Sequence, residues 1–256
     1  MTATETQNRL IDRQFGDQAA AYLDSPVHAG GPDLACLTWR IAELQPGVAV
    51  DLGAGGGHVS YAMAPHAGRV LACDLSEKML ATVAETAAAR GFAHVETHRA
   101  DVHHLPFADA SADFLASRYS AHHWTDLAAA LKEARRVLKP GATAIFMDVV
   151  SPGAPLLDTH LQAVELLRDP SHVRDYALGE WLSAFAQAAF AIRHVETFRL
   201  RLDFAPWVAR IGTAPERVAA IRTLQSDVAD EVKAYFAIEE DGSFTLDTAL
   251  IETAAA

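Results

Sequence analysis

The chain is poor in basic residues and in cysteine, and both shortages narrow what the protein can be. Its 256 residues include 21 Lys and Arg against 33 Asp and Glu, which gives a formal net charge of −12 at pH 7. Binding to nucleic acid needs clustered basic side chains, so we expect no nucleic-acid partner. The only cysteines are Cys36 and Cys73. Cys73 lies inside an apolar run, which favours a small core residue over half of a disulfide.

The sequence also lacks a stretch of about eighteen uncharged apolar residues, the length typical of a membrane-spanning helix. Residues 1–5 contain no basic region followed by an apolar one, as an export signal would. These absences predict a cytoplasmic protein with no membrane partner. We also expect no metal, because His103–His104 and His122–His123 are adjacent pairs and no Cys-x-x-Cys accompanies them.

Strand and helix patterns alternate along the middle of the chain. Apolar runs predict strands at 48–52, 69–73, 94–99, 112–117 and 142–149, and the intervening patterns predict helices at 57–65, 76–91 and 125–138. Ser76 and Gly91 are expected to cap and to end the second of these helices. Such alternation implies right-handed crossovers and a parallel sheet that is covered by helices on both faces.

Further patterns flank this central region. They predict helices over 9–24, 32–44, 156–168, 178–190 and 204–236 (with a break near 213–215) and strands over 192–202 and 244–251. We interpret the chain as a single α/β domain, 1–256. Its parts are N-terminal helices in 1–46, a ligand-binding core in 47–150, and added helices with the last strands in 151–256.

A glycine-rich turn lies between two acidic strand ends. The segment 50–57 reads V-D-L-G-A-G-G-G, and the next strand ends at Asp74. Gly53 and Gly55 allow a tight turn and the close approach of a bulky ligand. A dinucleotide-binding turn has a third glycine where this chain has His58. Asp51 would repel a pyrophosphate but suits a cationic, amino-bearing ligand, so the pattern favours S-adenosylmethionine over NAD.

The neighbouring residues extend this predicted site. Asp74 is expected to accept hydrogen bonds from both ribose hydroxyls, and Leu75 and Met79 to flank the adenine. Asp101, in the segment Ala100–Val102 after the third strand, is a candidate acceptor for the adenine amine. Its alternative is a loop-capping aspartate.

These motifs resemble the class I S-adenosylmethionine-dependent methyltransferases, in the small-molecule branch with the methyltransferase-11 type domain. The matching segments 50–57, 72–80, 101–107 and 133–141 span the central part of the chain. The resemblance implies a Rossmann-like seven-stranded sheet, mostly parallel with an antiparallel last strand. S-adenosylhomocysteine is then the product. The predicted cofactor-binding residues are Phe15, Tyr22, Asp51, Gly53, Ala54, Gly55, His58, Asp74, Leu75, Met79, Ala100, Asp101, Val102 and Arg118.

The N-terminal segment carries a second resemblance. Residues 14–16 and 20–22 are similar to the N-terminal helix of the ubiquinone/menaquinone and malonyl-carrier methyltransferases. In that family the helix closes over the methionine end of the cofactor. This resemblance implies a lid in 1–46. The class I methyltransferase architecture, in turn, implies a substrate cover in 151–256.

The segment after the fourth strand is expected to meet the methyl group. Methyl transfer mainly needs an aligned acceptor and, for some acceptors, removal of a proton. His123 is the first candidate for either role and His122 the alternative, although either could be structural. Asp148 stays undecided between solvent and pocket. Aromatic side chains that could contact the substrate, or pack in the core, are Tyr119, Trp124, Trp181 and Trp207.

The sequence thus predicts a methyltransferase for a small, planar heteroaromatic or quinone-like metabolite, acting at nitrogen, oxygen or carbon. The alternatives are methylation of an acyl group on a carrier protein and a cofactor-binding protein without catalysis. An NAD-dependent dehydrogenase is disfavoured by Asp51 and His58 in the glycine turn. Methylation of RNA or protein is disfavoured by the acidic net charge and by the segment Arg118–Ala121, which lacks an Asn-Pro-Pro-Tyr-like motif. We expect a monomer or a homodimer.

Overall fold

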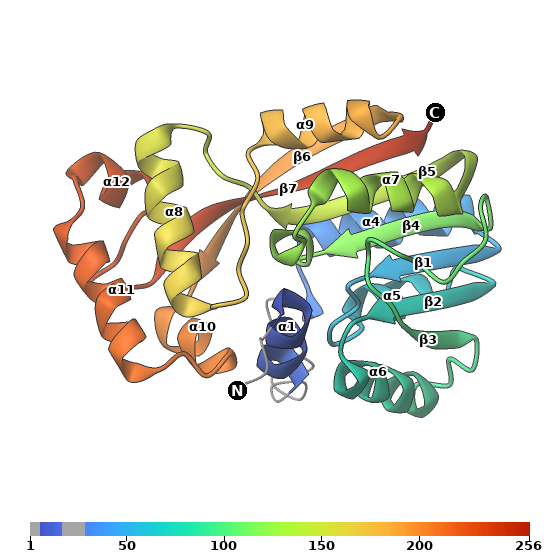
Figure 1. Ribbon diagram of the computed structural model, residues 1–256, viewed down its shortest axis with the longest axis horizontal. Coiled ribbons are helices and arrows are strands. Elements are labelled where there is room, and N and C mark those ends of the chain that lie inside the picture. The colour runs from blue at the N-terminus through green and yellow to red at the C-terminus, as the bar shows by residue number, and fades with distance from the viewer. Residues whose placement is uncertain (1–5, 17–28) are drawn as a thin grey trace.

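The computed structural model describes residues 6–16 and 29–256, and the strands of these residues form one seven-stranded sheet (Figure 1). The strand order is β3-β2-β1-β4-β5-β7-β6. The five strands β1 to β5 are all parallel to one another, whereas β7 is antiparallel to both of its neighbours, β5 and β6. The strands are β1 (Val48–Leu52), β2 (Arg69–Asp74), β3 (Val95–Arg99), β4 (Ala112–Arg118), β5 (Leu138–Val149), β6 (Phe190–Leu202) and β7 (Phe244–Ala255).

Helices cover both faces of the sheet because the central strands are apolar on both faces. In β4, Phe114 and Ala116 pack with one set of helices, and Leu115 packs with the other. The first set is α4 (Pro32–Leu44), α5 (His58–Met63) and α6 (Glu77–Ala89), and the second is α7 (Leu127–Val137) and α9 (Leu178–Gln187). This arrangement confirms the predicted Rossmann-like fold with its antiparallel last strand.

A second lobe, hereafter the C-terminal lobe, extends beyond one end of the sheet. It lies at the left of Figure 1, where helices gather around the ends of β6 and β7. Its own hydrophobic cluster includes Leu161, Trp207, Ile221, Phe236 and Leu246. The helices of the lobe are α8 (Pro155–Arg168), α10 (Phe204–Arg210), α11 (Pro215–Asp227) and α12 (Asp230–Tyr235).

Helix α1 (Gln7–Gly16) bridges the two parts of the molecule. It packs on α6, and the Gln14 side-chain amide donates to the carbonyl of Ile211, which follows α10. The Gln7 amide donates to the carbonyl of Ser171, which follows α8. The predicted helix over 9–24 is therefore present up to Gly16, and residues 17–24 lie outside the described residues.

Several predicted boundaries were wrong in the second half of the chain. The segment 204–236 forms three helices: the break near 213–215 was predicted, and Pro215 begins α11 after Gly212 with φ +69°, but a second break at Val228 and Ala229, before α12, was not predicted. The predicted helix over 178–190 ends at Gln187, because Phe190 already pairs with Ala255 in the sheet. Pairing also extends β5 back to Leu138 and β7 on to Ala255.

The structure also tests the predicted ends of α6 and the predicted burial of Cys73. Gly91 follows α6 with φ +77°, a conformation that suits glycine at a helix end. Ser76 precedes α6, but within the described residues its side chain forms no capping hydrogen bond. Cys73 is buried in the core, as predicted. Of the helices in the described ranges, none combines the length and the apolar character needed to cross a membrane.

Candidate active site

A cavity opens where β1, β2 and β4 end. Its walls come from the glycine turn after β1, the ends of β2 and β4, the segment after β3, and α1. We call it the first cavity. Its lining residues are Asn8, Ile11, Phe15, Gly53, Ala54, Gly55, Gly56, His58, Val59, Asp74, Leu75, Met79, Ala100, Asp101, Val102, His103, Arg118, Tyr119, Ser120, His123, Trp124 and Thr125.

Two glycines of the turn have different surroundings. Gly53 has φ +69°, and a Cβ at this position would lie 1.8 Å from the Ser120 hydroxyl oxygen, too close for any side chain. Gly55 has φ +49°, and no described atom lies within 4 Å of the position a Cβ would take. Gly53 is therefore required by close packing against the segment after β4. Gly55 faces open space at the edge of the cavity.

Asp74, at the end of β2, is held in place by the backbone. Its Oδ2 accepts from the N–H of Gly55 at 2.8 Å, and its Oδ1 accepts from the N–H of Ser76 at 2.9 Å. Burial raises the pKa of the carboxyl, and these backbone hydrogen bonds oppose that rise. A carboxylate oxygen accepts more than one hydrogen bond, so both oxygens keep capacity for a ligand.

Asp51, at the end of β1, lies behind the turn and does not line the cavity. Its side chain is buried, and Oδ2 accepts from the Ser60 hydroxyl at 2.6 Å. Oδ1 has no hydrogen-bond partner among the described residues. Burial raises the pKa of Asp51 to about 7, although the hydrogen bonds from Ser60 oppose the rise.

Asp101 joins α1 to the segment after β3. Its Oδ2 accepts from the side-chain amide of Asn8 at 2.8 Å, and its Oδ1 contacts Nδ1 of His103 at 2.5 Å. Burial raises the pKa of this carboxyl, but the hydrogen bonds from His103 and Asn8 lower it by more. The carboxylate is therefore charged at neutral pH and already has partners on both oxygens.

Arg118, at the end of β4, links the cavity wall to α4. Its guanidinium donates to the two carboxylate oxygens of Asp33 at 2.6 and 3.0 Å, a bidentate pair, and to the carbonyl of Gly30 at 2.9 Å. Both partners in the ion pair are buried. Arg118 therefore helps to fix α4 against the end of the sheet.

His122 forms a buried ion pair behind the cavity. Its Nδ1 lies 2.6 Å from Oδ1 of Asp148, whose Oδ2 accepts from the backbone N–H of Ala121 at 2.8 Å. Burial lowers the pKa of His122, but the charge of Asp148 raises it by more, to about 9. His122 is therefore an imidazolium at neutral pH. Asp148, left undecided by the sequence, faces this histidine.

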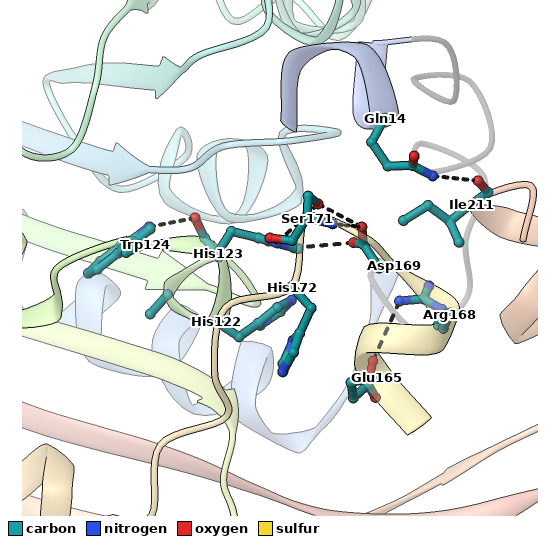
Figure 2. A network of polar contacts seen from close by, with 12 residues as sticks. Gln14, His122, His123, Trp124, Glu165, Arg168, Asp169, Ser171, His172 and Ile211 are labelled. Atoms are coloured by element: carbon teal, nitrogen blue, oxygen red, sulfur yellow. Dashed lines mark hydrogen bonds and ion pairs between the residues drawn. The ribbon is translucent and has the colours of Figure 1, made fainter. Parts of the chain in front are cut away.

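His123 has the opposite electrostatic character. Its Nδ1 lies 3.1 Å from the carbonyl of Ser171, and a carbonyl can only accept, so Nδ1 carries the proton. Figure 2 shows its ring directed toward Ser171 and Asp169, and Nε2 lies 3.8 Å from Oδ2 of Asp169. Burial and the neighbouring charge of His122 lower the pKa of His123 to about 4. This imidazole is therefore neutral at neutral pH and only weakly basic.

A second cavity adjoins the first on the side of the C-terminal lobe. The two cavities share Phe15, Tyr119 and His123, and the Phe15 and His123 rings meet edge to face with centroids 4.9 Å apart. The other residues that line the second cavity are His122, Val149, Glu165, Arg168, Asp175, Leu200, Leu202, Trp207, Arg210 and Leu246.

Comparison with known proteins adds a family to this geometry. A family model described as a methyltransferase domain matches residues 50–146. The uncharacterized methyltransferase YcgJ of Bacillus subtilis (strain 168) is 32% identical over 244 residues, which cover 93% of this chain and 96% of YcgJ. The crystal structure of YcgJ superimposes with a TM-score of 0.82 at 30% identity and covers 87% of this chain and 97% of that one.

The chain belongs to the class I S-adenosylmethionine-dependent methyltransferases. The uncharacterized protein YafE of Escherichia coli (strain K12) is also similar, at 46% identity over 77% of this chain and 95% of YafE. The malonyl-[acyl-carrier protein] O-methyltransferase of Pseudescherichia vulneris is 30% identical over 69% of this chain and 68% of that protein. The predicted membership of this branch is confirmed.

Most of the predicted cofactor residues line the first cavity of this methyltransferase. Asp51 lies behind the cavity, and Tyr22 lies outside the described residues. Predicted residues that line it are Phe15, Gly53, Ala54, Gly55, His58, Asp74, Leu75, Met79, Ala100, Asp101, Val102 and Arg118.

The predicted substrate-contacting aromatics separate into two groups. Tyr119 lines both cavities, Trp124 lines the first, and Trp207 lines the second. Trp181 lies in the core instead, where it stacks on Phe185 with centroids 5.4 Å apart and is 2% exposed. The expectation of a substrate contact at Trp181 was wrong, because α9 turns this side chain toward the apolar face of the sheet.

Sequence reasoning missed several residues that line the two cavities of the methyltransferase. In the first cavity these include Asn8, Ser120 and Thr125, and in the second Glu165 and Asp175. Ser120 could have been found, since it follows β4 next to residues that were singled out. No sequence signal marked Glu165, because α8 carries no motif.

Proposed function

We propose that this methyltransferase binds S-adenosylmethionine in the first cavity and methylates a small, planar heteroaromatic or quinone-like molecule held in the second. The observation that carries the proposal is the shared wall of Phe15, Tyr119 and His123. A methyl group at that wall would face an acceptor on the other side. Such a layout suits an in-line displacement, in which acceptor and leaving group lie on opposite sides of the carbon.

The residues of the first cavity fit this cofactor. The Asp74 carboxylate has remaining acceptor capacity for the two ribose hydroxyls, and Leu75 and Met79 provide an apolar wall for the adenine. The open space at Gly55 leaves room for the ligand next to the backbone. Asp51 lies behind the turn with Oδ1 unpartnered among the described residues and a pKa of about 7, and a cationic ligand nearby would lower that pKa and favour the charged carboxylate.

The bound cofactor would supply an electrophilic methyl group with a good leaving group, so the protein's task is to position the acceptor and exclude water. We propose that α1 closes over the first cavity, since Ile11 and Phe15 line it and Asn8 bonds to Asp101. Phe15 and Tyr119 then shield the reacting centre from solvent.

His123 is proposed to position the acceptor at the shared wall. Its proton on Nδ1 is donated to the Ser171 carbonyl, which fixes the ring against Phe15. A base with a pKa of about 4 has little power to remove a proton at neutral pH, which argues against deprotonation by His123. The neutral ring, fixed in orientation, instead provides a weakly polar surface against which the acceptor packs.

The experiment is a mass-spectrometric screen of a metabolite library with the purified protein and S-adenosylmethionine. We expect a planar aromatic or quinone-type compound to gain one methyl group, with matching formation of S-adenosylhomocysteine. Asp74→Ala serves as the matched control, because it should lower product formation from every acceptor. Methylation of an acyl-carrier protein but of no free metabolite would contradict the proposed acceptor class. Absence of cofactor binding in calorimetry would contradict the proposal as a whole.

A further inference from the structure

A buried carboxylate sets the orientation of His122 at the second cavity. Asp148 accepts backbone hydrogen bonds on both oxygens, from the N–H of Ala121 on Oδ2 and from the N–H of Val149 on Oδ1, each at 2.8 Å. These bonds favour the ionised carboxylate. Its Oδ1 lies 2.6 Å from Nδ1 of His122, and an ionised carboxylate can only accept, so Nδ1 carries the proton. The imidazole is thus held in one orientation and one tautomer.

The other ring nitrogen of His122 is available to a ligand. His122 lines the second cavity, and 16% of its side chain is exposed. Its Nε2 forms no hydrogen bond with any described residue, yet it keeps accessible surface. When Nδ1 carries the proton of a neutral imidazole, Nε2 carries a lone pair. The neutral ring therefore presents a proton acceptor to the second cavity.

This nitrogen lies on the acceptor side of the wall between the cavities. The rings of His122 and His123 are neighbours, with centroids 4.2 Å apart (Figure 2). His123 lines both cavities, whereas His122 lines only the second. An atom that receives a methyl group across the shared wall would therefore lie next to the His122 ring. Its proton would have to leave on this side, away from the first cavity.

We propose that His122, oriented by Asp148, removes the proton from the acceptor atom that becomes methylated. Only His122 would touch the acceptor, and Asp148 is a positioning residue. The inference rests on the proposed function and deepens it, because it names the acceptor atom. An O–H or N–H group can donate a hydrogen bond to Nε2, whereas a C–H group is a poor donor. The acceptor is therefore a compound with a hydroxyl, an amine or a ring N–H.

The proton and the electrons of this step balance. Nε2 takes the proton as the O–H or N–H bond breaks, and the electron pair of that bond forms the bond to the methyl carbon. The pair of the broken carbon–sulfur bond stays on sulfur. Asp148 stabilises the resulting imidazolium through Nδ1 until the proton passes to water, as a carboxylate does behind other catalytic histidines.

The surroundings of His122 predict how the rate depends on pH. Burial lowers its pKa, but the charge of Asp148 raises it by more, to about 9. Such an imidazole is a strong base, but only its neutral form can accept a proton, so the rate should rise with pH up to about 9. The other titratable or charged groups around this ring and its cavity are His123, Glu165, Arg168, His172, Asp175 and Arg210.

The first test needs no acceptor. It uses nitrogen-15 NMR of histidine-labelled protein with bound S-adenosylhomocysteine, and His122→Asn identifies the His122 signals by their loss. Nδ1 should stay protonated throughout, and Nε2 should titrate with a midpoint near pH 9. Asp148→Asn should lower that midpoint by about one pH unit or more. A neutral His122 with its proton on Nε2 would overturn the proposal, because no lone pair would then face the cavity.

The second test uses the metabolite library of the screen and measures formation of S-adenosylhomocysteine. His122→Ala should lower the rate by about 10²-fold or more and remove its rise toward pH 9. Added imidazole should restore about tenfold or more, since it can occupy the vacated space and take the proton. His194→Gln is the matched control, because His194 is exposed on β6 and lines neither cavity.

The outcomes separate this inference from the proposed function. Calorimetry first checks that His122→Ala still binds S-adenosylhomocysteine. If its pH–rate profile then keeps the wild-type shape, or imidazole restores nothing, His122 is not the base and the methyltransferase site stands. If the wild type methylates no compound of the library, or fails to bind S-adenosylhomocysteine, the proposed function itself is refuted.

Discussion

The two cavities of this methyltransferase are built in different ways. In the first, backbone atoms set the shape, because the turn after β1 fixes Gly53 and Gly55 and backbone N–H groups hold Asp74. In the second, side chains from β5, β6, β7, α8 and α10 converge, and these side chains set its shape and polarity. Substitutions in the backbone turn of the first cavity should therefore disturb its shape, whereas single side-chain substitutions in the second cavity should change its lining and leave the fold intact.

The largest effect is expected from Gly53→Ala. The new methyl group would overlap Ser120, and the positive φ adds strain, so we expect a loss of about 2–4 kcal/mol in unfolding free energy and of S-adenosylhomocysteine binding. Chemical denaturation and calorimetry measure the two quantities. Gly91→Ala is the control, since its φ is +77° but the space around it is open, and it should cost only about 1–2 kcal/mol without affecting affinity. Equal effects of the two substitutions would show that the turn is not closely packed.

The charged cluster next to the second cavity predicts a pH dependence of stability. The folded-state pKa of His122, about 9, exceeds the ordinary histidine value of 6.5, so its contribution to stability is complete below pH 6.5 and is lost as pH rises through 9. The loss amounts to up to about 3 kcal/mol. The pKa values of His123 and His172, about 4 and 3, are lowered, so these residues reduce stability as pH falls below 6.5.

Melting temperature as a function of pH measures this effect. It should fall as pH rises from 6.5 to 9, where the unfolded chain has lost the His122 proton that the folded protein still holds. His122→Asn should flatten the alkaline side, and His172→Gln the acidic side. An alkaline side that is unchanged in His122→Asn would refute the ion pair with Asp148 as its cause.

A smaller effect is expected from Asp74→Asn, which keeps the shape of the side chain and removes its charge. Losing a hydrogen bond that involves a charged group should weaken S-adenosylhomocysteine by about 1.5–3 kcal/mol. Calorimetry measures the affinity. Unchanged affinity for the cofactor product in a folded variant would remove Asp74 from the proposed ribose contact.

His123 should show a difference between two substitutions. If it positions the acceptor, His123→Gln should keep the rate within about tenfold and His123→Ala should lose more, about 10²-fold. The pH–rate profile of the glutamine variant should keep its shape, because the imidazole does not take up the proton. A rate that rises in the wild type through a pKa missing in His123→Gln would assign deprotonation to His123 after all.

The smallest effect concerns α1. Cofactor product in the first cavity should slow amide hydrogen exchange in residues 7–16 by about tenfold, as expected when a closed form gains about 1.4 kcal/mol. Exchange measured by mass spectrometry with and without S-adenosylhomocysteine checks this. Asn8→Ala should reduce the difference, because Asn8 bonds to Asp101. Identical exchange in both states would leave α1 as static packing.

The contrast between the cavities also explains what the sequence could predict. The alternation of strands and helices, the glycine turn and Asp74 follow from local patterns, since a few consecutive residues determine a strand end and its turn. The second cavity depends on pairs such as His122 with Asp148, or Arg168 with Trp207, which are far apart along the chain. The role of Trp181 was predicted wrongly for the same reason, because the sequence does not show whether the face of α9 that carries Trp181 packs on the core or lines a pocket.

The position of β7 has a consequence for the order in which the molecule assembles. Strand β6 precedes β7 in the chain, yet β7 lies between β6 and β5. During synthesis, the parallel strands β1 to β5 can pair as they emerge, whereas β6 has no neighbour until β7 follows. We expect the first cavity to form early and the second cavity late, since pairing over long sequence separations is slow. If β7 pairs slowly, an intermediate would form that has the first cavity but lacks the second.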